Sequence, residues 1–351
     1  MSGARTMKAA VVQRPGVLEV VEVPVPPVGD YDARCEMCYG ATCTGTDQHI
    51  IHGRIPWTVP YPVILGHESV GRVVETGSKV RHLKPGDLIT RVGAPAGLMP
   101  GLDVSWGGFV EYGVARDHRA AREDGRPKEE WNAFRVNQVV PEGIGAAEAT
   151  MIITWRETLS HITRMGVGAG ASVLVLGSGG NGLAFVAHAK NLGAECVAAV
   201  GSAARRDTAF AAGAGVYLDY RDEQLAERLA EAWPEGFDFI IDAVGKAGQI
   251  DRVLGMLRPG GTVTVYGIDD FNGIAINPRL AKGTFTYFNG GYDEEETHEQ
   301  VVSLMQSGAL DPSVWLDLDC AFPLTAIGEA FEVLQQRKMV KALIDLAPRK
   351  G

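Results

Sequence analysis

One short stretch of the chain, residues 173–185 (VLVLGSGGNGLAF), restricts the fold more than any other. Four apolar residues lead into the motif G-x-G-x-x-G, and an apolar, helix-like pattern follows it. A strand that turns into a helix at such glycines is typical of a dinucleotide-binding site. Gly177 would permit the tight turn, Gly179 the close approach of a pyrophosphate, and Gly182 the close packing of the helix. Free N–H groups at the helix N-terminus would bind the phosphates.

The pattern between residues 172 and 291 predicts an α/β domain with a doubly wound, largely parallel sheet. Strand-like apolar runs alternate there with helical stretches, and this alternation favours parallel strands joined by helices. The predicted strands are residues 172–176, 196–200, 216–218, 237–242, 262–266 and 284–288.

The residues before this domain predict a barrel-like β structure. Short, valine-rich runs are separated by Gly and Pro turns, as in residues 8–25 and 61–76. Two helical stretches, 294–307 and 324–338, and a final strand, 340–346, follow the α/β domain. We expect this final strand to return to the first domain.

Composition narrows the class of protein. The chain has 351 residues, enough for two domains, and its net charge of −10 argues against a nucleic-acid-binding surface. Its first residues lack the apolar segment of a signal peptide, and no apolar run reaches about 18 residues, so no membrane span is expected. The five cysteines are odd in number, which suggests reduced thiols. We therefore expect a cytoplasmic protein that acts on a small molecule.

Two local patterns have a structural interpretation. Cys35-x-x-Cys38 is not matched by a second such motif, so a pair of buried or strand-edge thiols is favoured over a zinc ribbon. Residues 117–135 are highly charged and indicate a solvated surface loop or short helix. A flap over the site and an oligomer contact are the alternatives for that stretch.

The end of the second predicted strand indicates which dinucleotide is bound. An Asp or Glu there normally binds the ribose 2′-hydroxyl, but this strand ends in Gly201-Ser202. Glycine leaves room for a 2′-phosphate, Ser202 can donate to it, and Arg205 or Arg206 can pair with it. Tyr220 could pack on the same phosphate. The pattern favours NADP(H) over NAD(H), unless both arginines are merely exposed helix residues.

Residues 41–49 (ATCTGTDQH) and 66–68 (GHE) carry the side chains for a reaction. The thiolate of Cys43, the imidazole of His67 and the carboxylate of Glu68 are a plausible ligand set for a catalytic zinc with an open position. Zinc would polarise an alcohol or carbonyl oxygen while hydride moves to or from the nicotinamide. Taken singly, His67 would more often be structural and Cys43 a small buried side chain.

Neighbouring residues could move the proton of the reaction. Thr46 could take it from the reacting oxygen, and His49 or His52 could pass it toward solvent. Asp47 could orient His67 from the far side of the ring. We predict Thr46, His49 and Glu68 as catalytic residues, with Glu68 also a metal-ligand candidate.

The whole chain resembles the medium-chain, zinc-type alcohol dehydrogenases. The motifs occur in family order: residues 8–11 (KAAV), 66–68 (GHE), 84–87 (KPGD), 106–112 (WGGFVEY), the G-x-G-x-x-G and 242–245 (DAVG). The resemblance implies a GroES-like catalytic domain, residues 1–158 and 293–351, around an inserted Rossmann domain, residues 159–292. It also implies a homodimer or homotetramer.

Two segments resemble particular branches of this family. The segment around Gly201-Ser202 and Tyr220 is similar to NADP-dependent secondary alcohol dehydrogenases. The Phe288-Asn289 stretch is similar to glucose dehydrogenases, in which an asparagine approaches nicotinamide and sugar. The predicted cofactor-binding residues are Gly177, Gly179, Gly180, Asn181, Gly182, Gly201, Ser202, Arg205, Arg206, Tyr220, Val244, Gly267 and Asn289.

The sequence departs from the family at the reacting site. One residue is inserted, so that either Cys43 or Thr44 occupies the ligand position. The family's third ligand would fall near Ile153 or Thr154, neither of them a good zinc ligand, and Glu157 lies almost one helical turn later. Residues 91–119 contain no cysteine, so a structural zinc is not expected. Whether the catalytic zinc is retained stays open.

Three functions are compatible with these patterns. The first is an NADP(H)-dependent oxidoreductase that interconverts a secondary alcohol and a ketone, with a sugar-like or cyclitol-like substrate favoured by the polar candidates Thr46, His49, Glu68 and Asn289. The second is a zinc-free reductase of the quinone, enone or iminium type, in which donors such as Thr46, Tyr39, His49 or Trp155 activate the substrate. The third is a non-catalytic NADPH-binding protein, because a fold alone does not fix a function.

Overall fold

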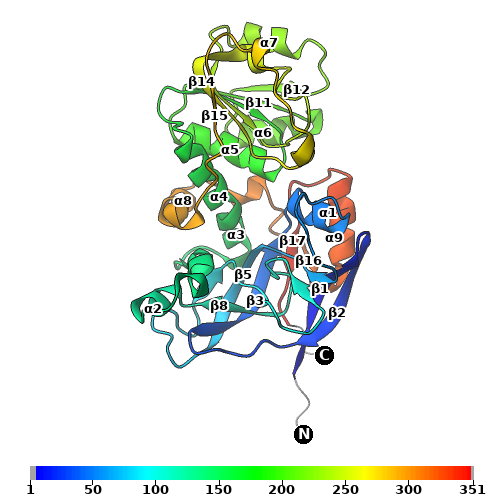
Figure 1. Cartoon of the computed structure of the whole chain (residues 1–351), viewed down its shortest axis with the longest axis vertical. Coiled ribbons are helices and arrows are strands. Elements are labelled where there is room, and N and C mark those ends of the chain that lie inside the picture. Colours follow the sequence, from blue (N-terminus) through cyan, green and yellow to red (C-terminus); the bar gives the residue numbers. More distant parts are fainter. Residues whose placement is uncertain (1–4, 349–351) are drawn as a thin grey trace. The chain divides into compact units, whose positions relative to one another are not determined.

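The computed structural model describes residues 5–348, which fold into two compact units (Figure 1). Unit 2 contains residues 154–297, and unit 1 contains the residues before and after it. The boundaries expected from the sequence, at 158/159 and 292/293, lie close to these positions. Helix α4 (Met151–Arg164) is continuous across the first boundary. The sequence of this helix therefore does not indicate where one unit ends and the other begins.

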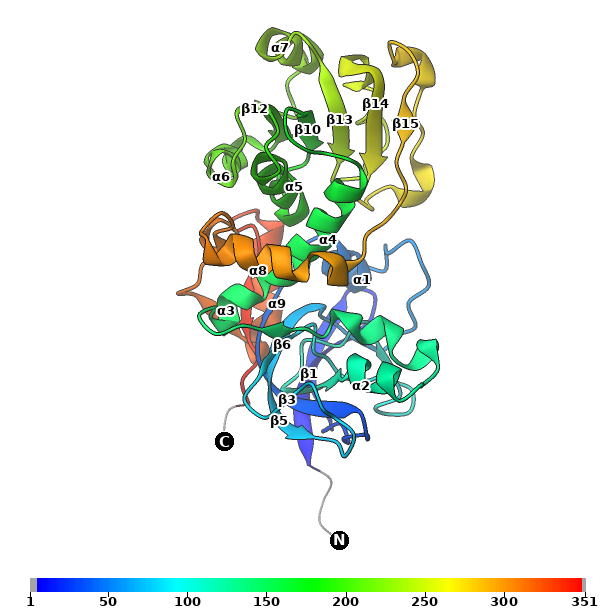
Figure 2. The ribbon, with the colours of Figure 1, turned by 90° about the vertical axis from the view of Figure 1, so that its left-hand side faces the viewer.

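Unit 2 is built on a six-stranded sheet in the order β12-β11-β10-β13-β14-β15. Every neighbouring pair is parallel, which confirms the predicted Rossmann sheet. Figure 2 shows β13, β14 and β15 side by side. The strands are β10 (Ser172–Leu176), β11 (Cys196–Gly201), β12 (Val216–Asp219), β13 (Phe237–Asp242), β14 (Leu257–Val265) and β15 (Thr286–Tyr287). The helices between them include α5 (Gly180–Asn191), α6 (Arg206–Ala212) and α7 (Leu225–Ala232).

The glycines of the motif have the geometry that the sequence predicts. Gly177 has a φ of 114°, which side chains rarely adopt. A Cβ on Gly182 would lie 2.1 Å from the carbonyl oxygen of Gly177, so only glycine lets α5 begin this close to β10. A Cβ on Gly179 would meet no atom within 4 Å, and this residue caps α5 in an extended conformation. The space beside Gly179 is therefore open to a ligand.

Unit 1 contains two β-sheets. The four-stranded sheet has the order β2-β1-β4-β7, and the seven-stranded sheet has the order β16-β17-β3-β5-β6-β9, with β8 paired to β3. Strand β17 pairs antiparallel with β3, which confirms that the final strand returns to the first domain. The strands are β1 (Thr6–Arg14), β2 (Val17–Pro24), β3 (Asp32–Ala41), β4 (Val63–Ile64), β5 (Glu68–Thr76), β6 (Leu88–Thr90), β7 (Asp103–Val104), β8 (Tyr112–Arg116), β9 (Val139–Val140), β16 (Ala321–Pro323) and β17 (Leu343–Asp345).

Short helices complete unit 1. Its apolar core includes Val11, Met37, Ile64 and Phe109, all at most 1% exposed. The cysteines of the C-x-x-C pair are free thiols on β3, one buried and one partly buried, as expected from the sequence. The helices are α1 (Thr46–Ile51), α2 (His118–Glu123), α3 (Ala146–Ala149), α8 (His298–Gln306) and α9 (Ile327–Gln335).

The charged stretch 117–135 folds onto unit 1 as α2 followed by two 3-10 turns. Asp117 caps α2 by accepting from the backbone N–H of Ala120. Arg81 forms ion pairs with Glu123 and Asp124, both at 3.0 Å. The stretch is therefore a short surface helix with turns, held by local ion pairs.

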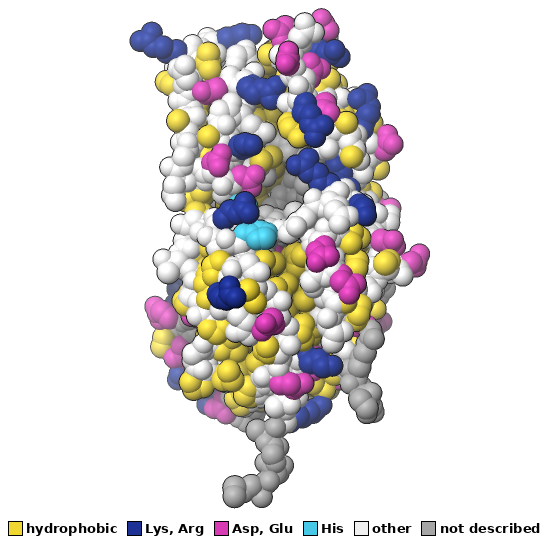
Figure 3. Space-filling model, turned by 90° about the vertical axis from the view of Figure 1, so that its right-hand side faces the viewer, with side chains coloured by type: hydrophobic (Ala, Val, Ile, Leu, Met, Phe, Trp, Pro, Cys, Tyr) yellow, Lys and Arg dark blue, Asp and Glu magenta, His cyan; other side chains and the backbone are white. Residues whose placement is uncertain are grey.

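No helix among residues 5–348 is both long and apolar enough to cross a membrane. On the face shown in Figure 3, acidic and basic side chains are interspersed, and no continuous basic stripe is visible there.

A buried histidine packs inside unit 2. The ring of His161 makes edge contacts with Phe185, Tyr266 and Phe288, at centroid distances of 5.7, 5.0 and 5.1 Å. Its Nε2 lies 3.2 Å from the hydroxyl of Thr264. Burial lowers the pKa of His161 to about 4, because the charged ring would lose its hydration.

This low pKa predicts acid sensitivity. The unfolded chain binds a proton on His161 near pH 6.5, whereas the folded chain does so only near its pKa of about 4. Stability is therefore complete above pH 6.5 and falls as the pH drops, by about 2 kcal/mol between pH 7 and pH 5. Burial also lowers the pKa of His188, to about 3, so this histidine adds a loss of the same sign. Urea unfolding should therefore show a loss of stability between pH 7 and pH 5 that is about 2 kcal/mol smaller in His161→Gln than in the wild type. Phe185→Leu, which perturbs the same aromatic cluster, should lower the free energy of unfolding by the same amount at pH 7 and pH 5. If the pH dependence of stability in His161→Gln equals that of the wild type, His161 is not a source of the acid sensitivity.

Candidate functional site

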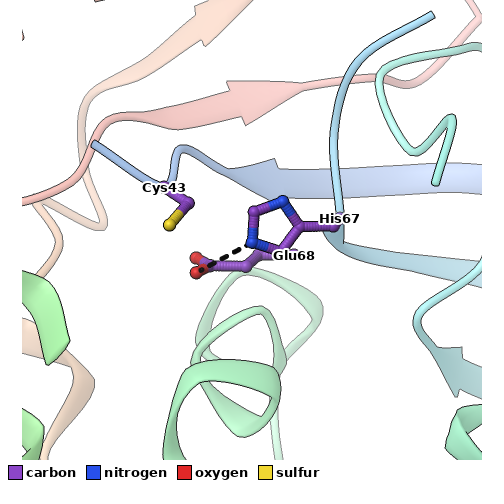
Figure 4. Close-up of side chains that lie close together, drawn as sticks. All are labelled: Cys43, His67 and Glu68. Atoms are coloured by element: carbon purple, nitrogen blue, oxygen red, sulfur yellow. Dashed lines mark ion pairs between the residues drawn. The ribbon is translucent and has the colours of Figure 1, made fainter. Parts of the chain in front are cut away.

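Strand pairing in unit 1 brings three reactive side chains together. Ala41, the last residue of β3, is paired with Glu68, the first residue of β5. Cys43 follows β3 by two residues, and His67 directly precedes β5. One ligand atom each from Cys43, His67 and Glu68 lies within 4.8 Å of the others, and all three side chains are buried (Figure 4).

This cluster fits a zinc ion by its chemistry. A thiolate, an imidazole and a carboxylate that converge at one point are ligands that zinc accepts. Figure 4 shows the ring of His67 directed toward the carboxylate of Glu68, with His67 Nε2 3.9 Å from Glu68 Oε1. At 3.9 Å these two atoms are too far apart for a direct hydrogen bond to each other.

Asp47 lies on the other side of the histidine ring. Its Oδ1 is 3.6 Å from His67 Nδ1, and its Oδ2 accepts from the backbone N–H of Cys43 at 2.9 Å. Burial lowers the pKa of His67, but Asp47 and Cys43 outweigh it and raise the pKa well above its usual value. A carboxylate in this place fixes the ring orientation of a metal-binding histidine, the role predicted for Asp47.

The inserted residue is absorbed in the turn before α1. The hydroxyl of Thr44 donates to the carbonyl of Val340 at 3.3 Å, whereas Cys43 belongs to the cluster. Between the two residues that the sequence left open, the structure therefore brings Cys43 to the ligand position. Thr46 lies beside it, with its hydroxyl oxygen 3.6 Å from the Cys43 sulfur.

The predicted proton-relay residues share helix α1 or its end. Nδ1 of His49 donates to the carbonyl of Gly45 at 2.6 Å, which leaves Nε2 as the ring nitrogen for other partners. Nε2 of His52 lies 3.4 Å from Gln335 Nε2. The structure places Thr46 at the cluster and both histidines farther along the same helix, so the order of the proposed relay is compatible with the fold.

A lysine that the sequence analysis missed completes the cluster. Lys341 is 2% exposed, and its Nζ donates to Glu68 Oε2 at 2.5 Å and to the carbonyl of Thr42 at 3.2 Å. Burial lowers the pKa of this lysine, but Glu68 and the nearby Cys43 outweigh that effect and raise it. The available signal was a lysine at the start of the otherwise mostly apolar final segment, residues 340–346.

The residues predicted to bind the ribose end of the cofactor lie in unit 2. A Cβ on Gly201 would lie 2.2 Å from the Ser178 hydroxyl oxygen and 2.4 Å from that of Tyr217. Tyr217 donates to the carbonyl of Ser202 at 2.7 Å, and Ser178 accepts from the Ser202 N–H at 3.2 Å. Glycine at 201 is therefore favoured by packing, and the space of a Cβ is filled by Ser178 and Tyr217 instead of being left for a phosphate, as the sequence had suggested.

The two predicted arginines follow Ser202 directly. Arg206 is exposed, with its guanidinium over the ring of Phe210 at 5.3 Å, and Arg205 is partly buried. The backbone N–H of Tyr220 donates to the carbonyl of Gly201 at 3.0 Å. The structure thus brings Gly201, Ser202 and Tyr220 to one end of the sheet.

The remaining cofactor candidates are at the ends of neighbouring strands. Val244 approaches the position of a Cβ on Gly177 to 2.9 Å, and a Cβ on Gly267 would lie 2.0 Å from the Val244 carbonyl carbon. These contacts place Gly177, Val244 and Gly267 at the same edge of the sheet. Asn289 is exposed just after β15.

Comparisons with known proteins agree with this arrangement. Residues 32–123 match the model of the alcohol dehydrogenase GroES-like domain, and residues 180–306 match that of the zinc-binding dehydrogenases. A probable zinc-binding alcohol dehydrogenase of Mycobacterium tuberculosis is 30% identical over 87% of this chain and 80% of its own length. The chain belongs to the zinc-binding alcohol dehydrogenases.

Two further likenesses extend over almost the whole chain. The sorbitol dehydrogenase of sheep is 26% identical over 96% of each chain. A structure assigned to the zinc-binding dehydrogenases, from Sinorhizobium meliloti and bound to NADP, has a TM-score of 0.78 and 24% identity, and covers 97% of this chain and 99% of its own. Members of this family oxidise or reduce alcohols and carbonyls by hydride transfer.

This alcohol dehydrogenase does not have a conventional third ligand on α4. Ile153, Thr154 and Trp155 are fully buried, and Ile153 belongs to unit 1 whereas the other two belong to unit 2. Glu157 accepts from the hydroxyl of Tyr266 at 3.3 Å within unit 2. Among the described residues, the group able to hold an ion consists of Cys43, His67 and Glu68 alone.

The Lys341–Glu68 ion pair should be essential for stability. Lys341→Ala leaves a buried carboxylate without its cation, which typically costs about 3–5 kcal/mol. Urea unfolding of protein treated with a chelator should show this loss in Lys341→Ala and much less of it in Lys341→Ala/Glu68→Gln, where the charge is also removed. Lys338→Ala, an exposed lysine three positions earlier, is the control and should stay within about 0.5 kcal/mol of the wild type. If Lys341→Ala is as stable as Lys338→Ala, the ion pair between Lys341 and Glu68 does not contribute to stability.

Proposed function

We propose that this protein is an NADP(H)-dependent, zinc-assisted dehydrogenase that interconverts a secondary alcohol and a ketone on a polyhydroxylated substrate. The observation that carries this proposal is the buried group of Cys43, His67 and Glu68, arranged around one point with Asp47 behind the histidine. A buried thiol, imidazole and carboxylate that converge on one point are not the side chains expected of a purely structural core. They do suit a metal that activates an oxygen atom.

The residues of the cluster would each have a role in the reaction. Zinc held by Cys43, His67 and Glu68 would act as a Lewis acid toward the reacting oxygen. Thr46 would accept the proton of the alcohol through its hydroxyl and pass it toward His49. Hydride would move from the alcohol carbon to the nicotinamide, and in the reverse direction from NADPH to the ketone. Lys341 would hold Glu68 in place through its hydrogen bond to Oε2.

The preference for NADP(H) rests on the residues after β11. Ser202, which is partly exposed, follows Gly201 directly and two arginines come soon after it, whereas β11 itself does not end in a carboxylate. A 2′-phosphate dianion would gain charge-assisted hydrogen bonds from Arg205 and Arg206. The NADP in the Sinorhizobium meliloti structure is compatible with this preference, but at 24% identity that likeness shows the fold alone.

The proposal of a polyhydroxylated substrate rests on polar groups and on one relative. Thr46 adjoins the cluster and His49 follows on the same helix, and both would hydrogen-bond to hydroxyls next to the reacting carbon. The sheep relative is named for sorbitol, a polyol. A sugar-like or cyclitol-like alcohol is therefore the substrate class that we propose.

Metal content and alcohol oxidation test this function together. Purified protein should contain zinc near one equivalent per chain, and it should reduce NADP⁺ with a panel of polyols. Cys43→Ala should lose the zinc and the oxidation, because it removes the one thiolate ligand, whereas Asp47→Asn should weaken zinc binding about 10–100-fold. Cys320→Ala, at an exposed cysteine, is the matched control and should keep both. Metal-free wild type that reduces an enone with NADPH would instead identify a zinc-free reductase, and NADPH binding without turnover a non-catalytic protein.

Cofactor preference is tested at the arginines, because Gly201→Asp would clash with Ser178 and Tyr217. Arg205→Ala/Arg206→Ala should raise KM for NADP(H) at least tenfold and leave KM for NAD(H) within about twofold, since each lost charge-assisted bond contributes about 1.5–3 kcal/mol. Steady-state kinetics with both cofactors measures this. Arg228→Ala, an exposed arginine on α7, serves as control. A parallel change with both cofactors would place the arginines outside the phosphate site.

A further inference from the structure

Two strained residues of unit 1 hold His67 from opposite ends. Among the described residues, Arg91, Trp106 and Arg337 are the non-glycine residues with positive φ, and the first two, both at 62°, contact His67. Arg91 Nη1 donates to the His67 carbonyl at 2.8 Å, and the Trp106 ring lies 5.0 Å from the His67 ring, tilted by 47°. Strain of this kind costs free energy and persists mainly where function requires the resulting geometry.

The indole of Trp106 is fixed and yet exposed. It is 44% exposed, although its ring adjoins a buried histidine, and the Arg91 guanidinium lies 5.9 Å from its centroid. Trp57, in the loop after α1, is 45% exposed. Large exposed aromatic side chains are typical of binding surfaces, because they offer much contact area at little cost in side-chain entropy.

Both tryptophans line the same pocket of about 300 Å³. The pocket lies between the loop before β4 and the segment around β7, two strands that pair in parallel. Trp106 therefore belongs at once to the wall of this pocket and to the surroundings of the proposed zinc ligand. The lining residues are Trp57, Thr58, Val59, Pro60, Val63, Asp103, Val104, Ser105 and Trp106.

We propose that Trp57 and Trp106 determine specificity by binding a neutral, ring-shaped polyol, such as a cyclitol or a pyranoside. This inference rests on the proposed function and names its substrate class. The apolar C–H face of a saturated ring stacks on an indole, while its hydroxyls bond to the hydroxyl of Ser105 or Thr58 and to the carboxylate of Asp103.

The charges of the pocket select against anionic sugars. Its lining contains one acid, Asp103, and no lysine, arginine or histidine. A sugar acid or a sugar phosphate would lose hydration and would face the carboxylate of Asp103, whereas the Arg91 guanidinium, although near Trp106, does not line the pocket. An acyclic polyol has the right hydroxyls, but it has no rigid apolar face to stack and loses torsional freedom on binding. A neutral ring is therefore favoured over both.

The test compares ring-shaped and open-chain polyols. Zinc-containing enzyme is assayed with NADP⁺ and three probes: myo-inositol or methyl β-D-glucopyranoside as rings, D-glucitol as an open chain, and D-gluconate as an anion. We expect the best ring to have the highest kcat/KM. In Trp57→Ala and Trp106→Ala, the preference for ring over chain should fall about tenfold, mainly through KM, while zinc content stays unchanged. Trp106→Phe should restore most of the preference.

A control variant and distinct negative outcomes separate this inference from the proposed function. Trp131 lies in the charged stretch 117–135, after α2, and does not line the pocket. Trp131→Ala should therefore keep the wild-type preference for ring over chain. If Trp106→Ala does not fold, Trp57→Ala alone decides, since Trp57 is not strained. Oxidation of polyols with an unchanged preference in the tryptophan variants, or a wild type that prefers D-glucitol or D-gluconate, overturns the inference and leaves the proposed function standing. No oxidation of any polyol by zinc-containing protein overturns both.

Discussion

The register of three strands is the constraint on which the site depends. Strand β3 pairs with β5 on one side and with β17 on the other, so Ala41 lies opposite both Glu68 and Leu343. This register buries Glu68 within reach of Lys341, which comes from the far end of the chain. A slip by one residue would turn these side chains to the opposite face of the sheet and leave a charge buried alone. The catalytic unit is therefore complete only when its last strand is in place.

The cofactor side depends on close packing of backbone. At Gly177, Gly182 and Gly201, a side chain would demand a rare φ or collide with atoms about 2 Å away. Because these positions accept glycine alone, the strand–turn–helix unit could be predicted from sequence, together with its parallel sheet. At Gly201 the structure adds a reason that sequence could not supply, since Tyr217 and Ser178 fill the space where a Cβ would stand.

The reacting side was only partly predictable. Cys43, His67 and Glu68 were found from local motifs, and their convergence required only that two segments meet at a strand end. Lys341 was not predicted, because its role depends on a contact with Glu68, which is 273 positions away in the sequence. Trp106 escaped because neither its positive φ nor its contact with His67 has a local signal: glycines normally occupy such positions, and two follow it directly. Long-range pairing and backbone strain are what a single sequence does not reveal.

Charge balance explains why a lysine belongs in this cluster. Cys43 and His67 must be deprotonated to bind a divalent cation, so a metal takes the place of protons that these groups can hold. Glu68 can contribute one oxygen toward that position while Lys341 holds the other. The ammonium thus gives the buried carboxylate a counter-charge, whether or not a metal is bound. If Glu68 held a metal, this pairing would limit the charge that the carboxylate could donate, and the metal would stay more electrophilic.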